Sequence, residues 1–462
     1  MNRIASLISL VGFLGVPLIA YQLLKNTVLD ISYPRINPWP LLWYFTLALV
    51  LVPVVIVSAR GIENTPGLYV AQPGTESIVA LVVLTTMIGY IITLAFFLRL
   101  FRLGLRKTAV SISRTEEKHL QEVALILSIL GLLTIAIFRF LGYKHAFLTA
   151  LLENRRLLEV RLANKYASHV PSQIASFLPL VGYLLSTIAG YIGRKNLGKS
   201  FWYLALSILF LSSPGDKAPP IWGVILWMLA QGSVLPKRVF SFRTIVAIGV
   251  VSLIGLATVY YVTSIQVPNM SREVFFKYLL ARIGIGQMAG MYETFGLIQT
   301  NSMPEGDFYL HMIPGAGFVT NYTDYHKALM MVTEGYEYTE MGVKNTLFVA
   351  EAWAIGGLPL ALFSPIIVGF STVIGLAVLI KVTRWIIGNE LAPSIGLLLY
   401  LKTHDITGGF SSFPLFKGLI LTVCYILIIA VSYYLFLAWK RILTVGPSNV
   451  ILRTRVSEPK RW

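Results

Sequence analysis

The stretch TLFVAEAWAIGGLPLALFSPIIVGFSTVIGLAVLI, residues 346–380, decides the fold, because Glu351 is its only charged residue. A helix needs about 20 apolar residues to cross the hydrocarbon core of a bilayer, so this run is too long for one straight crossing. Gly356-Gly357, Pro359 and Pro365 predict a kinked or two-part helix. Glu351 lies in the half that we expect to face outward and is therefore a candidate functional residue.

The composition of the whole chain agrees with a membrane protein. Of the 462 residues, 56% are hydrophobic and 13% are charged, whereas about 25% are charged in a typical soluble domain. The net charge of +17 fits cytoplasmic loops that retain Lys and Arg, and nucleic acid is not expected as a partner. The single cysteine, Cys424, excludes a disulfide framework and a cysteine metal cluster. The apolar N-terminus lacks an A-x-A-like cleavage site and is predicted to be a first membrane span.

Apolar windows predict an all-α polytopic protein, one transmembrane domain over 1–462 with about eleven spans. The predicted spans are 4–24, 41–58, 78–100, 122–141, 176–192, 200–213, 221–236, 244–263, 346–380, 386–401 and 415–438.

The loops divide by charge. This number of spans places all strongly basic segments on one side, which the positive-inside rule assigns to the cytoplasm; they are 101–121, 193–199, 237–243, the turn with Lys381 and Arg384, and the C-terminal tail. The other side receives 142–175, with an amphipathic helix at 152–166 that we expect on the membrane surface, and the large loop 264–345. Residues 284–345 hold seven acids against Lys327 and Lys344.

The motifs of common soluble enzymes are absent from the sequence: it has no G-x-x-x-x-G-K-[ST], H-E-x-x-H, C-x-x-C or G-x-S-x-G. ATP hydrolysis and zinc chemistry are therefore not expected, and the sequence predicts no cofactor and no metal. Polar residues on the outer segments are left as candidates.

The stretch LLARIGIGQMAGMYETF, 279–295, contains an arginine and a glutamate among apolar residues. On a continuous helix, Arg282 and Glu293 would share one face three turns apart. Arg282, beside glycines and at the outer boundary, is predicted to bind a diphosphate. Among Met288, Met291 and Phe295, Glu293 should have a raised pKa, as a general base requires; its alternative role is an ion pair with Arg282.

Other outer residues form a candidate polar set. Asn321, Tyr322 and Asp324 combine an amide, an aromatic ring and a carboxylate, a mixture suited to sugars, although ordinary loops have the same composition. Candidates for acid–base chemistry or binding are Glu293, His311, Asp324, His326, Glu351, His404 and Asp405, with Arg155, Arg156, Arg161, Lys217, Arg282 and Lys402 as cations.

These outer segments resemble the Wzy-type polymerases of bacterial surface polysaccharides such as O-antigen, most closely the enterobacterial common antigen branch. The resemblance rests on the arginine helix before the fifth span, on SPGDKAPPI, where relatives usually have arginine at the position of Lys217, on LLARIGIGQMAGMYETF, on HMIPG at 311–315 and on NTLFVAEAWAIGGLPLALFSPIIVG at 345–369.

The resemblance implies a glycosyltransferase of the membrane-embedded C type (GT-C) in the bacterial inner membrane, with its active site facing the periplasm. It would transfer a growing glycan from undecaprenyl diphosphate onto an incoming undecaprenyl-diphosphate-linked repeat unit, without a metal, and work with a Wzz-type chain-length regulator. Arg282, Arg161 and Lys217 would then bind diphosphate. Glu293 or His326 would take the acceptor proton, and Tyr322, Asp324 and Asn321 would hold sugar.

Two alternatives remain open. An O-antigen ligase shares this fold and donor but delivers the glycan to a different acceptor. A flippase for lipid-linked oligosaccharides is the second alternative; it would place charges near the bilayer midplane and show related halves, whereas the polar residues here gather at one face.

Overall fold

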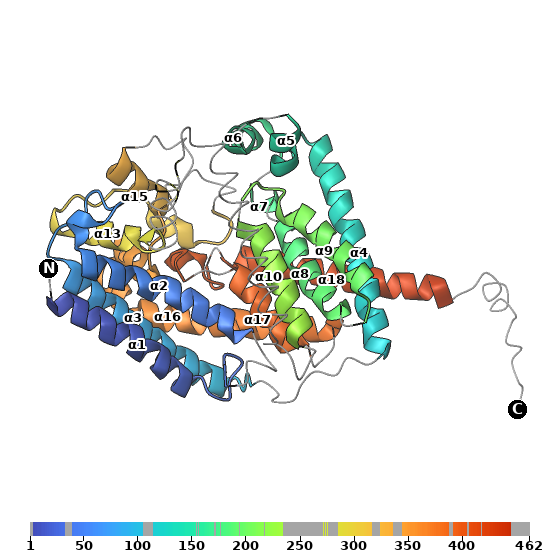
Figure 1. Ribbon diagram of the computed structural model, residues 1–462, viewed down its shortest axis with the longest axis horizontal. Coiled ribbons are helices and arrows are strands. Elements are labelled where there is room, and N and C mark those ends of the chain that lie inside the picture. The colour runs from blue at the N-terminus through green and yellow to red at the C-terminus, as the bar shows by residue number, and fades with distance from the viewer. Residues whose placement is uncertain are drawn as a thin grey trace, which may run out of the picture.

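The computed structural model (Figure 1) is helical, and the residues that it describes contain no β-strand. Thr346 and Gly408 form one isolated parallel bridge. The all-α prediction is therefore confirmed for the described residues, which are 3–32, 39–104, 114–153, 155, 157–170, 172–175, 177–193, 195–216, 218–233, 271, 273, 275, 285–316, 324–335, 344–387, 391–403, 406–416 and 418–444.

Six helices of the described chain are long and apolar enough to cross a membrane. They are α1 (Arg3–Leu23), α2 (Pro40–Arg60), α3 (Glu76–Leu100), α4 (Arg114–Phe140), α16 (Phe348–Ile387) and α18 (Gly418–Thr444). Each covers a predicted span. Their outward faces carry large apolar side chains such as Leu14, Phe96 and Leu362, which is the surface that hydrocarbon requires. By length and composition, the chain is an all-α membrane protein.

Four further predicted spans coincide with shorter helices, α8 (Phe177–Ile192), α9 (Leu197–Leu211), α10 (Ala218–Ser233) and α17 (Ala392–Thr403). Their lengths of 16, 15, 16 and 12 residues are below the about 20 residues of a straight crossing. The predicted span 244–263 lies outside the described residues. Helix length therefore supports six crossings, and the total of eleven stays a prediction.

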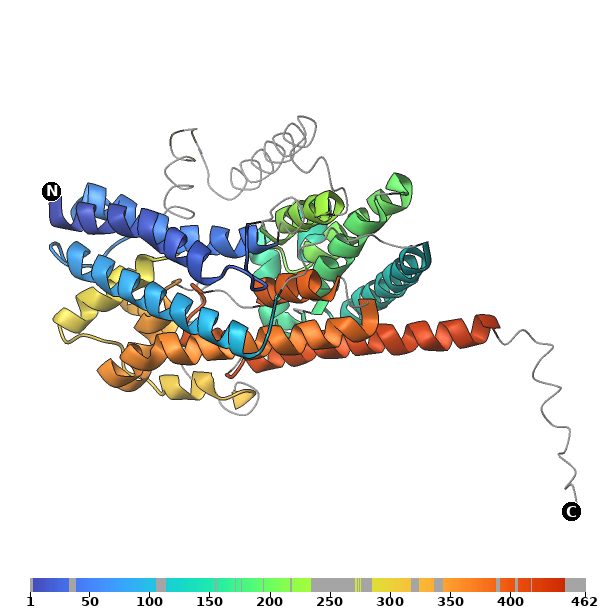
Figure 2. The ribbon, with the colours of Figure 1, turned by 90° about the horizontal axis from the view of Figure 1, so that it is seen from below.

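The helices form two groups that α16, α17 and α18 join. Helices α1, α2 and α3 pack together, and so do α4, α8, α9 and α10. Helix α16 packs on α3, α17 packs on both α16 and α8, and α18 packs on α16 and α4. Figure 2 shows α1, α3, α16 and α18 running in one direction.

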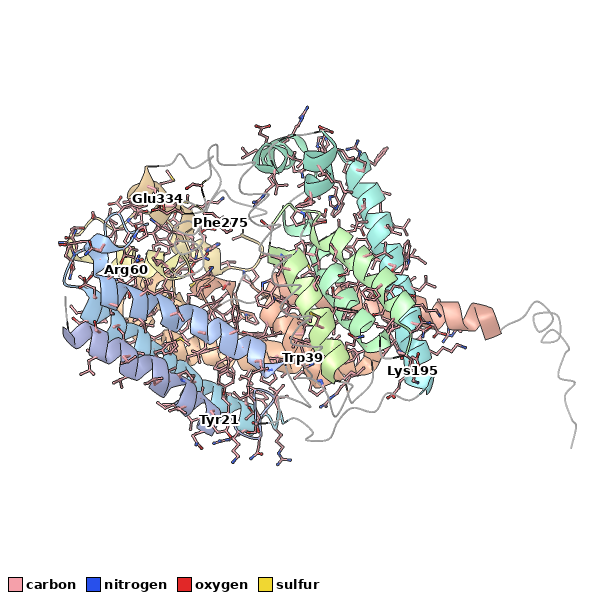
Figure 3. All side chains as sticks on the ribbon, viewed as in Figure 1. Tyr21, Trp39, Arg60, Lys195, Phe275 and Glu334 are labelled. Atoms are coloured by element: carbon pink, nitrogen blue, oxygen red, sulfur yellow. The ribbon has the colours of Figure 1, made fainter. Side chains whose placement is uncertain are left out.

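The charged segments lie at opposite ends of these helices. Figure 3 places Lys195, from the basic segment 193–199, at the lower right and Glu334, from the acid-rich segment, at the upper left. In Figure 1 the short helices within residues 146–167 lie at the upper edge, and those of 289–299 and 325–334 lie at the upper left.

The kink predicted in α16 is confirmed. Gly356 (φ −137°, ψ 19°) and Gly357 (φ 63°, ψ −158°) leave helical geometry. The positive φ of Gly357 favours glycine, and Pro359 supplies no N–H to continue the ladder. The break divides α16 into a short first part that contains Glu351 and a long second part.

In the segment 264–345 the bounds of three short helices are described: α13 (Ala289–Gln299), the 3₁₀ helix η3 (Phe308–Met312) and α15 (Tyr325–Glu334). The continuous helix expected through 279–295 is wrong, because α13 begins at Ala289, after a turn at 286–288 that Met288 ends (φ −125°, ψ 1°). The helical spacing that put Arg282 and Glu293 on one face does not hold across this turn.

The segment 142–175 also differs from its prediction. The helix expected at 152–166 begins later, as α6 (Leu157–Ala167), and two further short helices lie before and after it, α5 (Ala146–Leu152) and α7 (Ser172–Ala175). Leu157 and Val160 of α6 are buried against Ala146 of α5. This apolar side of α6 therefore packs on protein, whereas Leu151 and Leu152 at the end of α5 are exposed.

Candidate functional site

A buried carboxylate at the start of α16 holds three chain segments together. Glu351 Oε1 accepts a hydrogen bond from Ser411 Oγ (2.7 Å) and lies 3.0 Å from His311 Nδ1, while Oε2 accepts the Ser411 N–H (3.0 Å). His311 comes from η3, and Ser411 from the 3₁₀ helix η4 (Phe410–Ser412). A buried carboxylate is tolerated only with such partners.

His311 connects this carboxylate to a second one. Its Nε2 lies 3.4 Å from Asp324 Oδ2. The Asp324 side chain is 20% exposed, whereas those of His311 and Glu351 are 4% and 0% exposed. Asp324 also caps α15, since its Oδ1 accepts the His326 N–H at 2.9 Å. Asp324 is therefore the member of this group that faces outward, and its position is fixed by the helix that it starts.

His326 approaches Glu351 from the other side. Its Nδ1–H donates to the carbonyl oxygen of Lys344 (2.9 Å), and its Nε2 lies 3.6 Å from Glu351 Oε2. Burial lowers the pKa of His326, but the carboxylates of Glu351 and Asp324 outweigh burial and raise the pKa to about 9. We call Glu351, His311, His326, Asp324 and Ser411 the Glu351 network.

Gly409 lies close to both Glu351 and His326 in this network, where a side chain would not fit. Its φ of 93° favours glycine, and a Cβ there would overlap both Glu351 Oε2 and His326 Nε2. The bridge between Thr346 and Gly408 holds this part of the chain beside the start of α16.

A second cluster of charged side chains surrounds Lys344, the residue whose carbonyl oxygen accepts the hydrogen bond from His326. The Lys344 ammonium forms ion pairs with Glu293 and with Glu334 Oε1 (2.8 Å), and it donates to Thr333 Oγ1 (2.9 Å). Glu293 Oε1 also accepts the backbone N–H of Tyr69 (2.9 Å). Burial raises the pKa of Glu293, and Lys344 and the Tyr69 N–H oppose that rise. We call Lys344, Glu293, Glu334 and Thr333 the Lys344 cluster.

The predicted site residues divide into three sets. The structure brings His311, Asp324, His326 and Glu351 together in one network, and it places Glu293 in the neighbouring Lys344 cluster. Arg161 lies on α6 and pairs with Asp216 at 2.9 Å, and Figure 1 shows α6 beside α5, away from α13 and α15. Arg156, Lys217, Arg282, Asn321, Tyr322, His404 and Asp405 lie outside the described residues.

The sequence reasoning missed Ser411, Gly409 and Lys344. Ser411 and Gly409 lie in LKTHDITGGFSSFP, where a double glycine precedes two serines after His404 and Asp405; that pattern is a usable signal for a tight polar turn. Lys344 is one of two lysines among seven acids in 284–345, and such an isolated cation is a reasonable candidate for an ion pair.

The Glu351 network can hold and move protons but is not built for nucleophilic attack. Ser411 Oγ lies 2.8 Å from His311 Nδ1, as in a serine–histidine pair, yet Ser411 is fully buried and its hydroxyl donates to Glu351. No substrate carbonyl can reach it. Among the described residues, no group of His, Cys, Asp and Glu is arranged to hold a metal ion.

Comparison with known proteins adds no relative: no family model, no curated protein and no solved structure matches this chain.

Proposed function

We propose that this protein is a membrane-embedded glycosyltransferase that polymerises undecaprenyl-diphosphate-linked repeat units of a surface polysaccharide. The observation that carries the proposal is the Glu351 network. A partly exposed carboxylate, Asp324, contacts His311, which in turn contacts the buried Glu351. This group lies at the end of an all-helical membrane protein opposite to its basic segment 193–199. A sugar hydroxyl needs a base of this kind, and a lipid-linked substrate needs it at the end of the membrane spans.

In this proposal Asp324 receives the proton of the acceptor hydroxyl. His311 and Glu351 hold the Asp324 side chain in position, because Nε2 of His311 faces Asp324 and Nδ1 faces Glu351. His326, on the far side of Glu351, adjusts the charge of the network. In this proposal Glu293 is not the general base, because its carboxylate is already paired with the ammonium of Lys344.

The leaving group is a diphosphate, which requires cations. We assign diphosphate binding to Arg282, Lys217 and Arg161. Guanidinium and ammonium groups stabilise the negative charge that develops on a departing diphosphate. Because Arg161 is paired with Asp216, it would have to exchange that partner for the diphosphate. The site faces the periplasm in this proposal.

The test uses purified protein in liposomes with the lipid-linked repeat units extracted from its own host, and product length is read on a gel. We expect a ladder of polymers with the native chain. We expect Asp324→Asn to lower the rate by roughly 10²–10⁴-fold, as loss of a general base does. Asp307→Asn is the matched control, because Asp307 is an exposed acid of the same segment with no side-chain cap bond.

Two outcomes would overturn the proposal. One is the absence of any ladder with native protein and native repeat units, and the other is an Asp324→Asn protein as active as the control. Deletion of the gene separates the related activities: loss of a polymerase leaves single repeat units on the surface, whereas loss of a ligase leaves polymer on its lipid carrier.

A further inference from the structure

A cavity lies where α4 ends, between that helix, α5 and α8, remote from the Glu351 network. Its volume is about 240 Å³, below the about 300–1,000 Å³ of sites that enclose a whole small molecule. Its apolar lining comes from Ile135, Phe138, Leu148, Leu152 and Leu178. A space of this size and character suits a short part of a hydrocarbon chain.

The side chains of His145 and Glu153 in the lining are bound to protein groups, whereas that of Arg139 is the exception. His145 Nε2–H donates to the Leu209 carbonyl oxygen (2.9 Å), and its Nδ1 accepts the Leu148 N–H (3.2 Å). Burial lowers the pKa of His145, so this ring is neutral. Glu153 is paired with Lys144 (3.7 Å) and with Arg155 (3.2 Å).

The exception is Arg139, in the last turn of α4. It lines the cavity, is exposed, and forms no ion pair with any residue that the structure describes. Lys144 and Arg155 pair with Glu153 of the lining, so these three groups together with Arg139 carry an excess of positive charge. The mouth of an apolar cavity is therefore positively charged, and an anion is the complementary ligand.

The surroundings show where such a ligand comes from. Helix α4 is one of the six helices that can cross a membrane, and its candidate span ends at Phe140. Phe140 is 90% exposed, and Leu152 at the rim of the cavity is 80% exposed. Bare apolar side chains beside an arginine at the end of a span mark the boundary between hydrocarbon and headgroups.

The geometry points to a binding site for one anionic phospholipid of the surrounding bilayer, with its phosphate on Arg139 and the part of an acyl chain nearest the glycerol in the cavity. The remainder of the lipid lies along the outward face of α4. This site does not depend on the proposed transferase activity, because it shares no residue with the Glu351 network and its occupant is not a glycan carrier.

The test is native mass spectrometry of the full-length protein in detergent, titrated with phosphatidylglycerol or with phosphatidylcholine of the same acyl chains. We expect one phosphatidylglycerol to bind more tightly than the rest. Arg139→Gln should weaken that binding about fivefold, the worth of one cation near a lipid phosphate. Leu148→Trp should abolish it by filling the cavity.

Two matched controls separate the site from the general surface. Arg60 is an exposed last-turn arginine of α2, so Arg60→Gln should leave binding unchanged. Leu151 is exposed on α5 but does not line the cavity, so Leu151→Trp should do the same.

Equal affinity for the two phospholipids, or native affinity in both Arg139→Gln and Leu148→Trp, would overturn the inference. Displacement of phosphatidylglycerol by a smaller amount of undecaprenyl phosphate would also overturn it, because the cavity would then be a site for the carrier lipid. None of these readouts involves polymer formation, so failure here is distinguishable from failure of the proposed function.

Discussion

The Lys344 cluster and the Glu351 network each place a fully buried glutamate in the same part of the molecule, but the partners differ in kind. Glu293 faces the ammonium group of Lys344 in an ion pair. Glu351 faces two histidines and a serine, and an imidazole ring can both accept and release a proton. The first cluster is suited to holding the chain in place, and the second is suited to handling protons.

The two regions share one residue. The side chain of Lys344 belongs to the first cluster, and its carbonyl oxygen accepts the Nδ1–H of His326 in the second. The ion pairs that hold Lys344 therefore also fix the direction of the His326 ring. We infer that the ion pair between Glu293 and Lys344 helps to keep Nε2 of His326 directed at Glu351.

The largest expected effect comes from breaking the fixed pair. Lys344→Met leaves the buried Glu293 carboxylate without its counter-ion, and we expect the free energy of unfolding to fall by about 3–5 kcal/mol. Chemical denaturation in mixed detergent micelles measures it. The double variant Lys344→Met with Glu293→Met removes both charges and should recover most of the loss. A single variant as stable as the native chain would show that the pair is not a clamp.

The second prediction concerns pH and only the Glu351 network. The pKa of His326 is about 9 in the folded chain and about 6.5 in an unfolded one. A raised pKa means that the stabilisation is complete below about pH 6.5 and is lost as pH rises through about 9. The loss should amount to about 3 kcal/mol between these values.

Denaturation curves at several pH values between 6 and 9.5 check this slope. His326→Gln should flatten it, whereas Lys195→Gln, which changes an exposed charge at the opposite end of the helices, should keep it. A slope that survives in His326→Gln would assign the titration to another group.

The third prediction tests how closely the network is packed. Gly409→Ala combines the strain of a positive φ with overlap against Glu351 and His326, and we expect a cost of about 2–3 kcal/mol. Gly74 is the matched control, since its φ is 89° and no atom would contact its Cβ. Gly74→Ala should cost only the strain, about 1 kcal/mol. Equal losses in the two variants would show that the space beside Gly409 is not tight.

The fold was predictable to the extent that it depends on the lengths of apolar runs. The kink at Gly356-Gly357 and the six long helices follow from local sequence, because glycine, proline and unbroken apolar residues act over a few positions. The start of α13 was not predictable in this way. The turn that ends at Met288 depends on tertiary contacts, such as the Gly290 N–H donating to the Asn345 carbonyl oxygen (3.0 Å).

The site was predictable by residue type but not by partnership. His311, Asp324, His326 and Glu351 are rare polar residues in apolar or outer segments, and their chemistry marked them. Their pairing joins positions 40 residues apart for His311 and Glu351 and 100 residues apart for His311 and Ser411. No spacing rule within one helix or strand reaches such distances. For the same reason the partner of Glu293 was sought at Arg282, and Lys344 was missed.

The smallest expected change in stability belongs to Asp324, the member of the Glu351 network that faces outward. Asparagine caps a helix about as well as aspartate, so Asp324→Asn should keep the bond to the His326 N–H and change the free energy of unfolding by less than about 0.5 kcal/mol. Asp324→Ala loses the cap and should cost about 1 kcal/mol. Denaturation of both variants at pH 7 separates the cap from the charge. If Asp324→Asn is as unstable as Asp324→Ala, the contact between Asp324 and His311 stabilises the fold, and a loss of activity in Asp324→Asn could no longer be assigned to a missing base.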